Sequence, residues 1–164
     1  MRYFAALFLR MALAGTTALV CAKATEVASQ ETARGITDQR VKTMKIRMDV
    51  EGTVIMATLD DNETSRDFAS LLPLALTLED YAGTEKISDL PRRLSTAGTP
   101  PGTAGTAGDI AYYVPWGNLA LFYRDGSYAK GLVRLGRVDT GVATFASPKS
   151  LNVIIEAIEW EEVE

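Results

Sequence analysis

The chain has 164 residues, a length that suits one domain with short extensions. Apolar residues make up 47% of it, and a net charge of −4 gives no electrostatic reason to expect binding to nucleic acid or to an anionic membrane. Histidine is absent, which excludes a Ser–His–Asp triad, a Cys–His pair and a histidine-bound metal. We therefore predict no metal site and no cofactor, and acid–base chemistry would need a shifted carboxylate, lysine or tyrosine.

Residues 1–24 have the features of a secretory signal. Arginines stand at positions 2 and 10, Met11–Val20 is mostly apolar, and Ala22-Lys23-Ala24 matches the small-x-small cleavage pattern. We predict cleavage near Ala24 and a secreted or periplasmic protein with no membrane span in its mature form. An uncleaved anchor helix is the alternative, although the apolar run is short for a bilayer.

Cys21 is the only cysteine and lies within the segment predicted to be removed. The mature protein would then hold no thiol and no disulfide. A lipoprotein with Cys21 lipidated is a weaker alternative, because Val20 directly before the cysteine fits a lipobox poorly. Beyond the signal, the polar composition of residues 25–43 predicts a flexible leader, residues 44–160 form the domain, and residues 161–164 form an acidic tail.

The domain begins with a predicted hairpin. Apolar and charged residues alternate strictly over Met44–Val50, which indicates a half-buried strand. Glu51-Gly52 is a turn, and the β-branched and apolar stretch Thr53–Leu59 is the returning strand.

A short helix follows the hairpin. Thr64 and Asp67 have capping-box spacing, and the apolar residues Phe68, Leu71 and Leu72 share one helical face. Pro73 ends the helix, because a proline disfavours helical geometry in the preceding residue. We expect eight to ten helical residues that bury Phe68 and Leu72 at one end of a barrel.

The middle of the chain predicts one strand and one long loop. Leu74–Tyr81 alternates and is a strand, and the mixed segment 81–94 holds a short strand or turn near Leu94. The low-complexity stretch Ser95–Gly108 is a loop. Its repeated Thr-Ala-Gly lacks the Gly-Lys-Ser/Thr of a phosphate loop.

A second hairpin carries most of the aromatic residues. Its strands are Asp109–Val114 and Asn118–Tyr123, joined across Pro115-Trp116-Gly117. Alternation places Tyr112 and Tyr113 on opposite faces, and it separates Phe122 from Tyr123 in the same way.

After this hairpin the sequence predicts four more elements: a turn at Asp125–Ser127, a strand at Gly131–Val138, one helical turn within Asp139–Ala146 and a final strand at Leu151–Trp160. The last strand has apolar residues on both faces, which suggests an interior place in the sheet. Seven or eight short strands with one or two short helices fit a closed β-barrel capped by helices.

Four segments resemble the bacterial cyclophilin-like fold family: Asn62–Tyr81, Leu90–Thr96, Gly108–Asp125 and Leu135–Gly141. The resemblance extends over nearly the whole domain. It implies a mainly β fold, a closed antiparallel eight-stranded cyclophilin-like β-barrel capped by one or two short helices. The family includes exported members whose domain follows a signal and a leader, and the resemblance implies no particular reaction.

A looser resemblance links the chain to true cyclophilins. Gly108–Ala111 followed by Gly117–Phe122 is similar to one of their runs. Cyclophilins isomerise X–Pro bonds with an arginine beside an apolar pocket that includes a histidine. By order in the chain, Arg92 and Arg93 lie where that arginine would fall, whereas the histidine has no counterpart.

We therefore predict that the domain binds a small molecule or a proline-containing peptide segment in a groove on the barrel. The candidate ligand-binding residues are Arg92, Arg93, Tyr112, Trp116 and Tyr123. No residue is assigned a catalytic role. The alternatives are a peptidyl-prolyl cis-trans isomerase with a reduced active site lacking histidine, and a domain that only makes protein contacts through exposed aromatic residues.

Each candidate also has a purely structural interpretation. Arg92 and Arg93 could be an exposed pair that balances Glu85 and Asp89, and Trp116 could be a rim residue folded over the barrel mouth.

Overall fold

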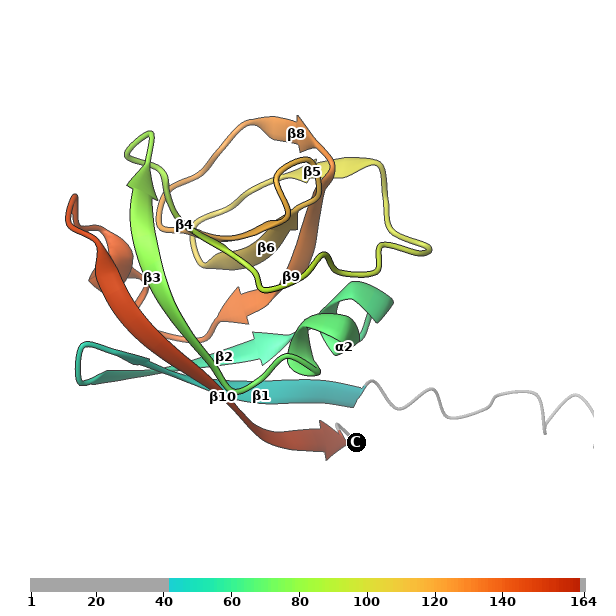
Figure 1. The fold of residues 1–164 in the computed structure, drawn as a ribbon, viewed down its shortest axis with the longest axis horizontal. Coiled ribbons are helices and arrows are strands. Elements are labelled where there is room, and N and C mark those ends of the chain that lie inside the picture. The colour runs from blue at the N-terminus through green and yellow to red at the C-terminus, as the bar shows by residue number, and fades with distance from the viewer. Residues whose placement is uncertain (1–41, 163–164) are drawn as a thin grey trace, which may run out of the picture. The chain divides into compact units, whose positions relative to one another are not determined.

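The structure is a computed structural model that describes residues 42–162, with side chains described for residues 43–158 (Figure 1). The predicted signal at 1–24 lies outside the described residues, as does nearly all of the predicted leader. The leader's last two residues, Lys42 and Thr43, belong to the first strand, so the domain begins slightly earlier than the alternation predicts.

Eight strands form a closed barrel in the order β1-β10-β3-β4-β7-β6-β9-β2, and every neighbouring pair is antiparallel. Their bounds are β1 (Lys42–Val50), β2 (Thr53–Leu59), β3 (Leu74–Tyr81), β4 (Glu85–Asp89), β6 (Asp109–Tyr113), β7 (Asn118–Phe122), β9 (Leu132–Val138) and β10 (Leu151–Glu162). The mainly β, closed eight-stranded barrel predicted from the sequence is confirmed.

Three smaller parts surround the barrel. A two-stranded sheet pairs β5 (Gly102–Ala104) with β8 (Tyr128–Lys130). The helix α2 (Glu63–Ala69) and the 3-10 turn η1 (Val142–Phe145) are the short helices expected from the sequence. Figure 1 shows the β5–β8 ribbon beside β6 and β9, on the side away from β1.

Strict alternation fills the barrel interior. In β1 the apolar residues Met44, Ile46, Met48 and Val50 are all buried, while the charged residues between them face out. The final strand differs from its prediction in one respect. β10 does lie between β1 and β3, but its outward Ile154 remains 51% exposed, so only one of its apolar faces is covered.

Closure of the barrel requires a glycine where β9 meets β2. Gly136 pairs with Leu59, and a Cβ on Gly136 would lie 2.2 Å from the carbonyl oxygen of Thr58. No side chain fits at that separation, so Gly136 permits the close approach of the two backbones.

The helix begins two residues earlier than the capping-box spacing predicts. Asn62 is the N-cap, and its side chain accepts a hydrogen bond of 2.9 Å from the backbone N–H of Ser65. Asparagine caps as well as serine or threonine does, so the predicted cap Thr64 is instead buried inside the first turn. The helix has seven residues and buries Phe68 completely against the barrel.

Three strands lie where the sequence did not indicate them: β4, β5 and β8. The sequence predicts a short strand or turn near Leu94, but the structure has no strand there, and β4 ends at Asp89 instead. The sequence Glu-Lys-Ile-Ser-Asp of β4 lacks the apolar pattern typical of a strand, because its completely buried residue is the charged Lys86. β5 consists of Gly-Thr-Ala and has no apolar period that could have indicated it within the low-complexity loop.

Lys86 is fully buried at one end of the barrel and fixes a loop there. Its ammonium donates hydrogen bonds to the carbonyl oxygens of Ser147 and, at 2.7 Å, Lys149. It also lies 3.3 Å from Asp80, which accepts a 2.6 Å hydrogen bond from the hydroxyl of Tyr123. The Tyr123 hydrogen bond is the main cause that lowers the pKa of Asp80, and it raises the pKa of Tyr123.

Asp67 ties the helix to the segment that follows β4. Arg92 binds it with two hydrogen bonds, of 2.6 Å and 2.9 Å, and the backbone N–H of Ser95 adds a third of 2.7 Å. These bonds stabilise the ionised carboxylate, and they lower the pKa of Asp67 to about 2, with the Arg92 hydrogen bond as the largest cause.

We predict that Lys86→Met lowers the free energy of unfolding by about 2–4 kcal/mol, because the carbonyl oxygens of Ser147 and Lys149 lose a fully buried donor and Asp80 loses its cation. Urea unfolding followed by circular dichroism measures it. Lys45→Met is the matched control, since Lys45 pairs with Asp139 in a half-exposed position and should change stability by less than about 1 kcal/mol. Equal effects of the two substitutions would contradict the role of Lys86.

We predict that Asp67→Asn lowers stability at pH 7 by about 1 kcal/mol, a value reduced because Arg92 is 46% exposed. A carboxylate with a depressed folded-state pKa stabilises the fold above its unfolded pKa, which is near 4. The difference between wild type and variant should therefore shrink as the pH falls from about 4 towards 2. Asp61→Asn, which removes the more exposed pair with Arg66, should have a smaller effect, and an identical pH profile would contradict the prediction.

Candidate functional site

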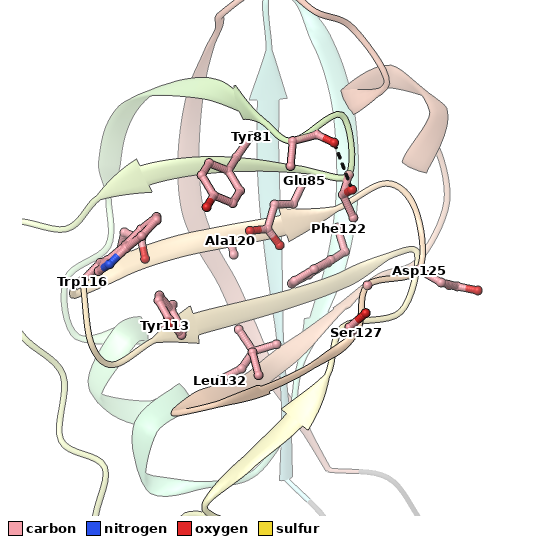
Figure 2. Close-up of a pocket in the computed structure, with 14 residues that line it drawn as sticks. Tyr81, Glu85, Tyr113, Trp116, Ala120, Phe122, Asp125, Ser127 and Leu132 are labelled. Carbon is pink, nitrogen blue, oxygen red and sulfur yellow. Dashed lines mark hydrogen bonds between the residues drawn. The ribbon is translucent and has the colours of Figure 1, made fainter.

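A cavity of about 390 Å³ lies over the outward face of the barrel wall formed by β6, β7 and β9 (Figure 2). Its base is Ala120 of β7, flanked by Tyr113, Phe122 and Leu132. The turn after β3 and the residues between β7 and β8 complete its sides.

The hollow follows from small residues on an outward face. Ala111 of β6 pairs with Ala120 of β7, and both belong to an outer cluster with Phe122 and Leu132 that is separate from the barrel core. Two adjacent methyl groups between larger side chains leave space above them. The same strands send Tyr112, Leu119 and Leu121 into the core.

Three aromatic rings meet at one end of the cavity. The ring of Trp116 lies 5.5 Å from that of Tyr81 and 5.4 Å from that of Tyr113, measured between centroids, and both pairs are edge-to-face. Trp116 is 53% exposed and Tyr81 is 42% exposed, so their faces are available to a ligand. Figure 2 shows these rings bordering the space above Ala120.

Hydrogen bonds within and beside its turn hold Trp116 in position. Gly117 has φ of 77°, which closes the turn, and its N–H donates to the carbonyl of Tyr113 at 2.8 Å. Arg93 donates a 2.7 Å hydrogen bond to the carbonyl of Val114. Trp116 therefore lies on a turn that hydrogen bonds hold in place.

Glu85 supplies the charge inside the cavity. Its side chain points into the space beneath Tyr81, towards Ala120 and Phe122 (Figure 2). Burial raises the pKa of its carboxyl group. Asp125 also lines the cavity, but its carboxylate accepts a hydrogen bond from the N–H of Ala107 and points away from the other side chains. In the part of the chain that the structure describes, no lysine or arginine lines this cavity.

Asn118 adds a polar group to the lining. It is 2% exposed, and none of the described residues donates a hydrogen bond to its side-chain oxygen. Buried polar atoms are nearly always paired, so this oxygen is a natural acceptor for a ligand donor.

The glycine-rich loop closes the other end. A Cβ on Gly105 would lie 2.4 Å from the ring of Phe122, and Gly126 approaches the same ring. The two glycines are joined by a backbone hydrogen bond of 2.8 Å. The low-complexity segment thus has a packing role beside the cavity, which its composition alone did not reveal.

Of the five predicted ligand-binding residues, the structure places Trp116 in the cavity. Tyr112 lies in the core, where its hydroxyl accepts a 3.2 Å hydrogen bond from the N–H of Leu94. Tyr123 packs against the core and binds Asp80. Arg92 pairs with Asp67 and Arg93 with the Trp116 turn, so the five residues do not form one site.

Sequence reasoning missed most of the cavity. Tyr113 and Phe122 could have been found, because each alternates with a residue that the pattern places in the core. Tyr81 and Glu85 could not have been found from a local pattern. Tyr81 pairs with Glu85, and Glu85 pairs with Phe122, so strand pairing brings both residues to the cavity.

A larger hollow of about 610 Å³ lies between the helix start and the loop around Gly98–Thr106. Its cationic side chains are already engaged, because Arg134 binds Asp60 at 2.8 Å and Arg66 pairs with Asp61. The cavity beside Trp116 is therefore the better candidate, since it presents aromatic faces and acceptor oxygens that the described residues leave available.

The described residues contain no group of three or more acidic, histidine or cysteine side chains placed to hold a metal ion. Within residues 42–162, no helix has the length and apolar character needed to cross a membrane. The lining of the cavity offers aromatic faces, a carboxyl group and a side-chain amide.

Comparison with solved structures finds the solution structure of a hypothetical protein from Archaeoglobus fulgidus, with a TM-score of 0.52 and 18% sequence identity over 74% of this chain and 100% of that one. At that identity the likeness shows the fold alone. A comparison with curated proteins gives no significant match. A family model described as the Cyclophilin-like family matches residues 48–156, from β1 to β10. With the barrel topology and this match, the chain belongs to the cyclophilin-like family.

Proposed function

We propose that the protein binds a small molecule or a short peptide segment in the cavity beside Trp116. The observation that carries this proposal is the exposed Trp116 ring standing on a braced turn above a hollow that small residues leave open. Aromatic rings that are half exposed at the mouth of a concave site are typical of ligand recognition. The volume of about 390 Å³ suits a small ligand or one side chain of a peptide.

Peptidyl-prolyl isomerisation is the alternative that the sequence raised. Its candidate groups are Arg92 and Arg93, whose guanidinium groups donate hydrogen bonds to Asp67 and to the Val114 carbonyl. No observation in the described structure favours isomerisation over binding. A coupled assay on several X–Pro peptides tests it, with Arg93→Ala as the variant.

Export is a further part of the proposal. It rests on the signal-like features of residues 1–24, which lie outside the described residues. The intact mass of the protein recovered from the culture medium or the periplasm tests it, because cleavage after Ala24 leaves a chain that begins at Thr25.

We predict that a thermal-shift screen of metabolites and short peptides finds compounds that raise the melting temperature, because binding to the folded state stabilises it. Trp116→Ala should weaken the affinity for such a compound at least about tenfold, which is about 1.4 kcal/mol.

The matched control is Tyr128→Ala, which removes an exposed aromatic ring outside the cavity lining. Its affinity for the compound should stay within a factor of about two. The proposal is wrong if Trp116→Ala and Tyr128→Ala leave the shift equally intact, since the compound would then bind elsewhere.

A further inference from the structure

We propose that the ligand of this cavity carries a cationic alkylammonium group, which sits against the ring of Trp116 and beside the carboxylate of Glu85. The inference rests on the proposed binding function and names the chemical class of the ligand. Three features of the cavity support it: the charge of the lining, the arrangement of the aromatic rings, and two polar side chains without hydrogen-bond partners among the described residues.

The charge of the lining selects against an anion. Glu85 points inward, and Asp125 lies at the margin with its carboxylate directed outward. Lysine and arginine do not occur in the lining as the structure describes it. An anionic ligand would therefore meet repulsion with no compensating partner, whereas a cation would neutralise Glu85.

The described residues also leave Glu85 without a partner. Burial raises the pKa of its carboxyl group, and none of the described residues donates a hydrogen bond to that group or forms an ion pair with it. Three other acidic side chains with restricted exposure, those of Asp67, Asp80 and Asp109, each bind an arginine or lysine. A half-buried carboxylate without such a partner is stabilised when a ligand brings the missing positive charge.

The aromatic rings suit the same group. Trp116, Tyr81 and Tyr113 meet edge-to-face, so their planes differ in direction by 81° and 87° around the tryptophan. Rings set at such angles offer electron-rich faces to a cation from more than one side, and tryptophan is the strongest of them. Quaternary ammonium groups are recognised by this combination of rings and a nearby carboxylate.

Asn118 provides an independent observation. Asn118 is one of the lining residues, and its buried side-chain oxygen accepts no hydrogen bond from the described residues. Together with Glu85 it makes the polar part of the lining rich in acceptors. A cationic ligand that also carries an N–H or O–H donor matches both groups, whereas a purely apolar ligand would leave them unpaired.

The experiment compares choline with 3,3-dimethyl-1-butanol, in which a carbon replaces the nitrogen and removes the charge at constant shape. Isothermal titration of the protein should give an affinity for choline at least about tenfold higher than for the alcohol. Glu85→Gln should reduce the affinity for choline about tenfold and leave that for the alcohol unchanged. Glu79→Gln is the matched control and should change neither by more than about twofold, because Glu79 is exposed on β3 and does not line the cavity.

A third probe separates the two sources of an alkylammonium group. The amide of Nα-acetyl-Nε-trimethyl-lysine represents a peptide side chain, and choline represents a free small molecule. Tighter binding of either one supports the proposal and identifies the source.

The failure of this inference is distinguishable from failure of the proposed function. Equal binding of choline and the alcohol, with both lost in Trp116→Ala, overturns the cationic ligand and leaves the binding function intact. The same holds if neither probe binds while a compound from the thermal-shift screen still depends on Trp116. If Trp116→Ala changes the binding of no compound at all, both proposals are wrong.

Discussion

The alternation of side chains along the β6–β7 hairpin is the constraint on which the rest of the structure depends. Successive residues of a strand face opposite sides, so this one wall must serve the barrel core and the outer cavity together. Tyr112 is buried in the core and its neighbour Tyr113 borders the cavity. Leu121 and Phe122 divide in the same way. A shift of one residue in register would exchange the two sets, so the site is as strongly specified as the barrel itself.

The segment from Arg92 to Ser95 connects this wall to the helix. Its arginines bind Asp67 on α2 and the Val114 carbonyl on the hairpin, and the N–H of Leu94 donates to the hydroxyl of Tyr112. The segment thus packs against the β6–β7 hairpin and helps to hold the Trp116 turn in place. The two arginines that the chain order associates with catalysis hold protein groups in this structure, and Arg93 is the one that holds the turn carrying Trp116.

Much of the fold could be predicted because its signals are local. The alternation of Met44–Val50 and the break at Pro115–Gly117 each lie within a few residues, and they indicate strands and turns directly. β4 was misplaced because its completely buried residue is Lys86, whose burial depends on carbonyl groups about sixty residues away in the chain. The candidate site was predicted only at Trp116 for a similar reason. Tyr81 and Glu85 come to line the cavity because β3 pairs with β4 and β4 pairs with β7. No sequence pattern within β3 or β4 indicates these pairings.

We propose that ligands bind at the outer face of the β6–β7 wall. Amide chemical-shift mapping of the isotope-labelled protein, titrated with any compound that binds it, tests this claim most directly. The account predicts that the largest shifts cluster at Tyr81–Glu85, Tyr113–Asn118 and Phe122–Ser127, the three segments that surround the cavity. Shifts centred instead on the hollow around Gly98–Thr106, with these three segments unmoved, would contradict it.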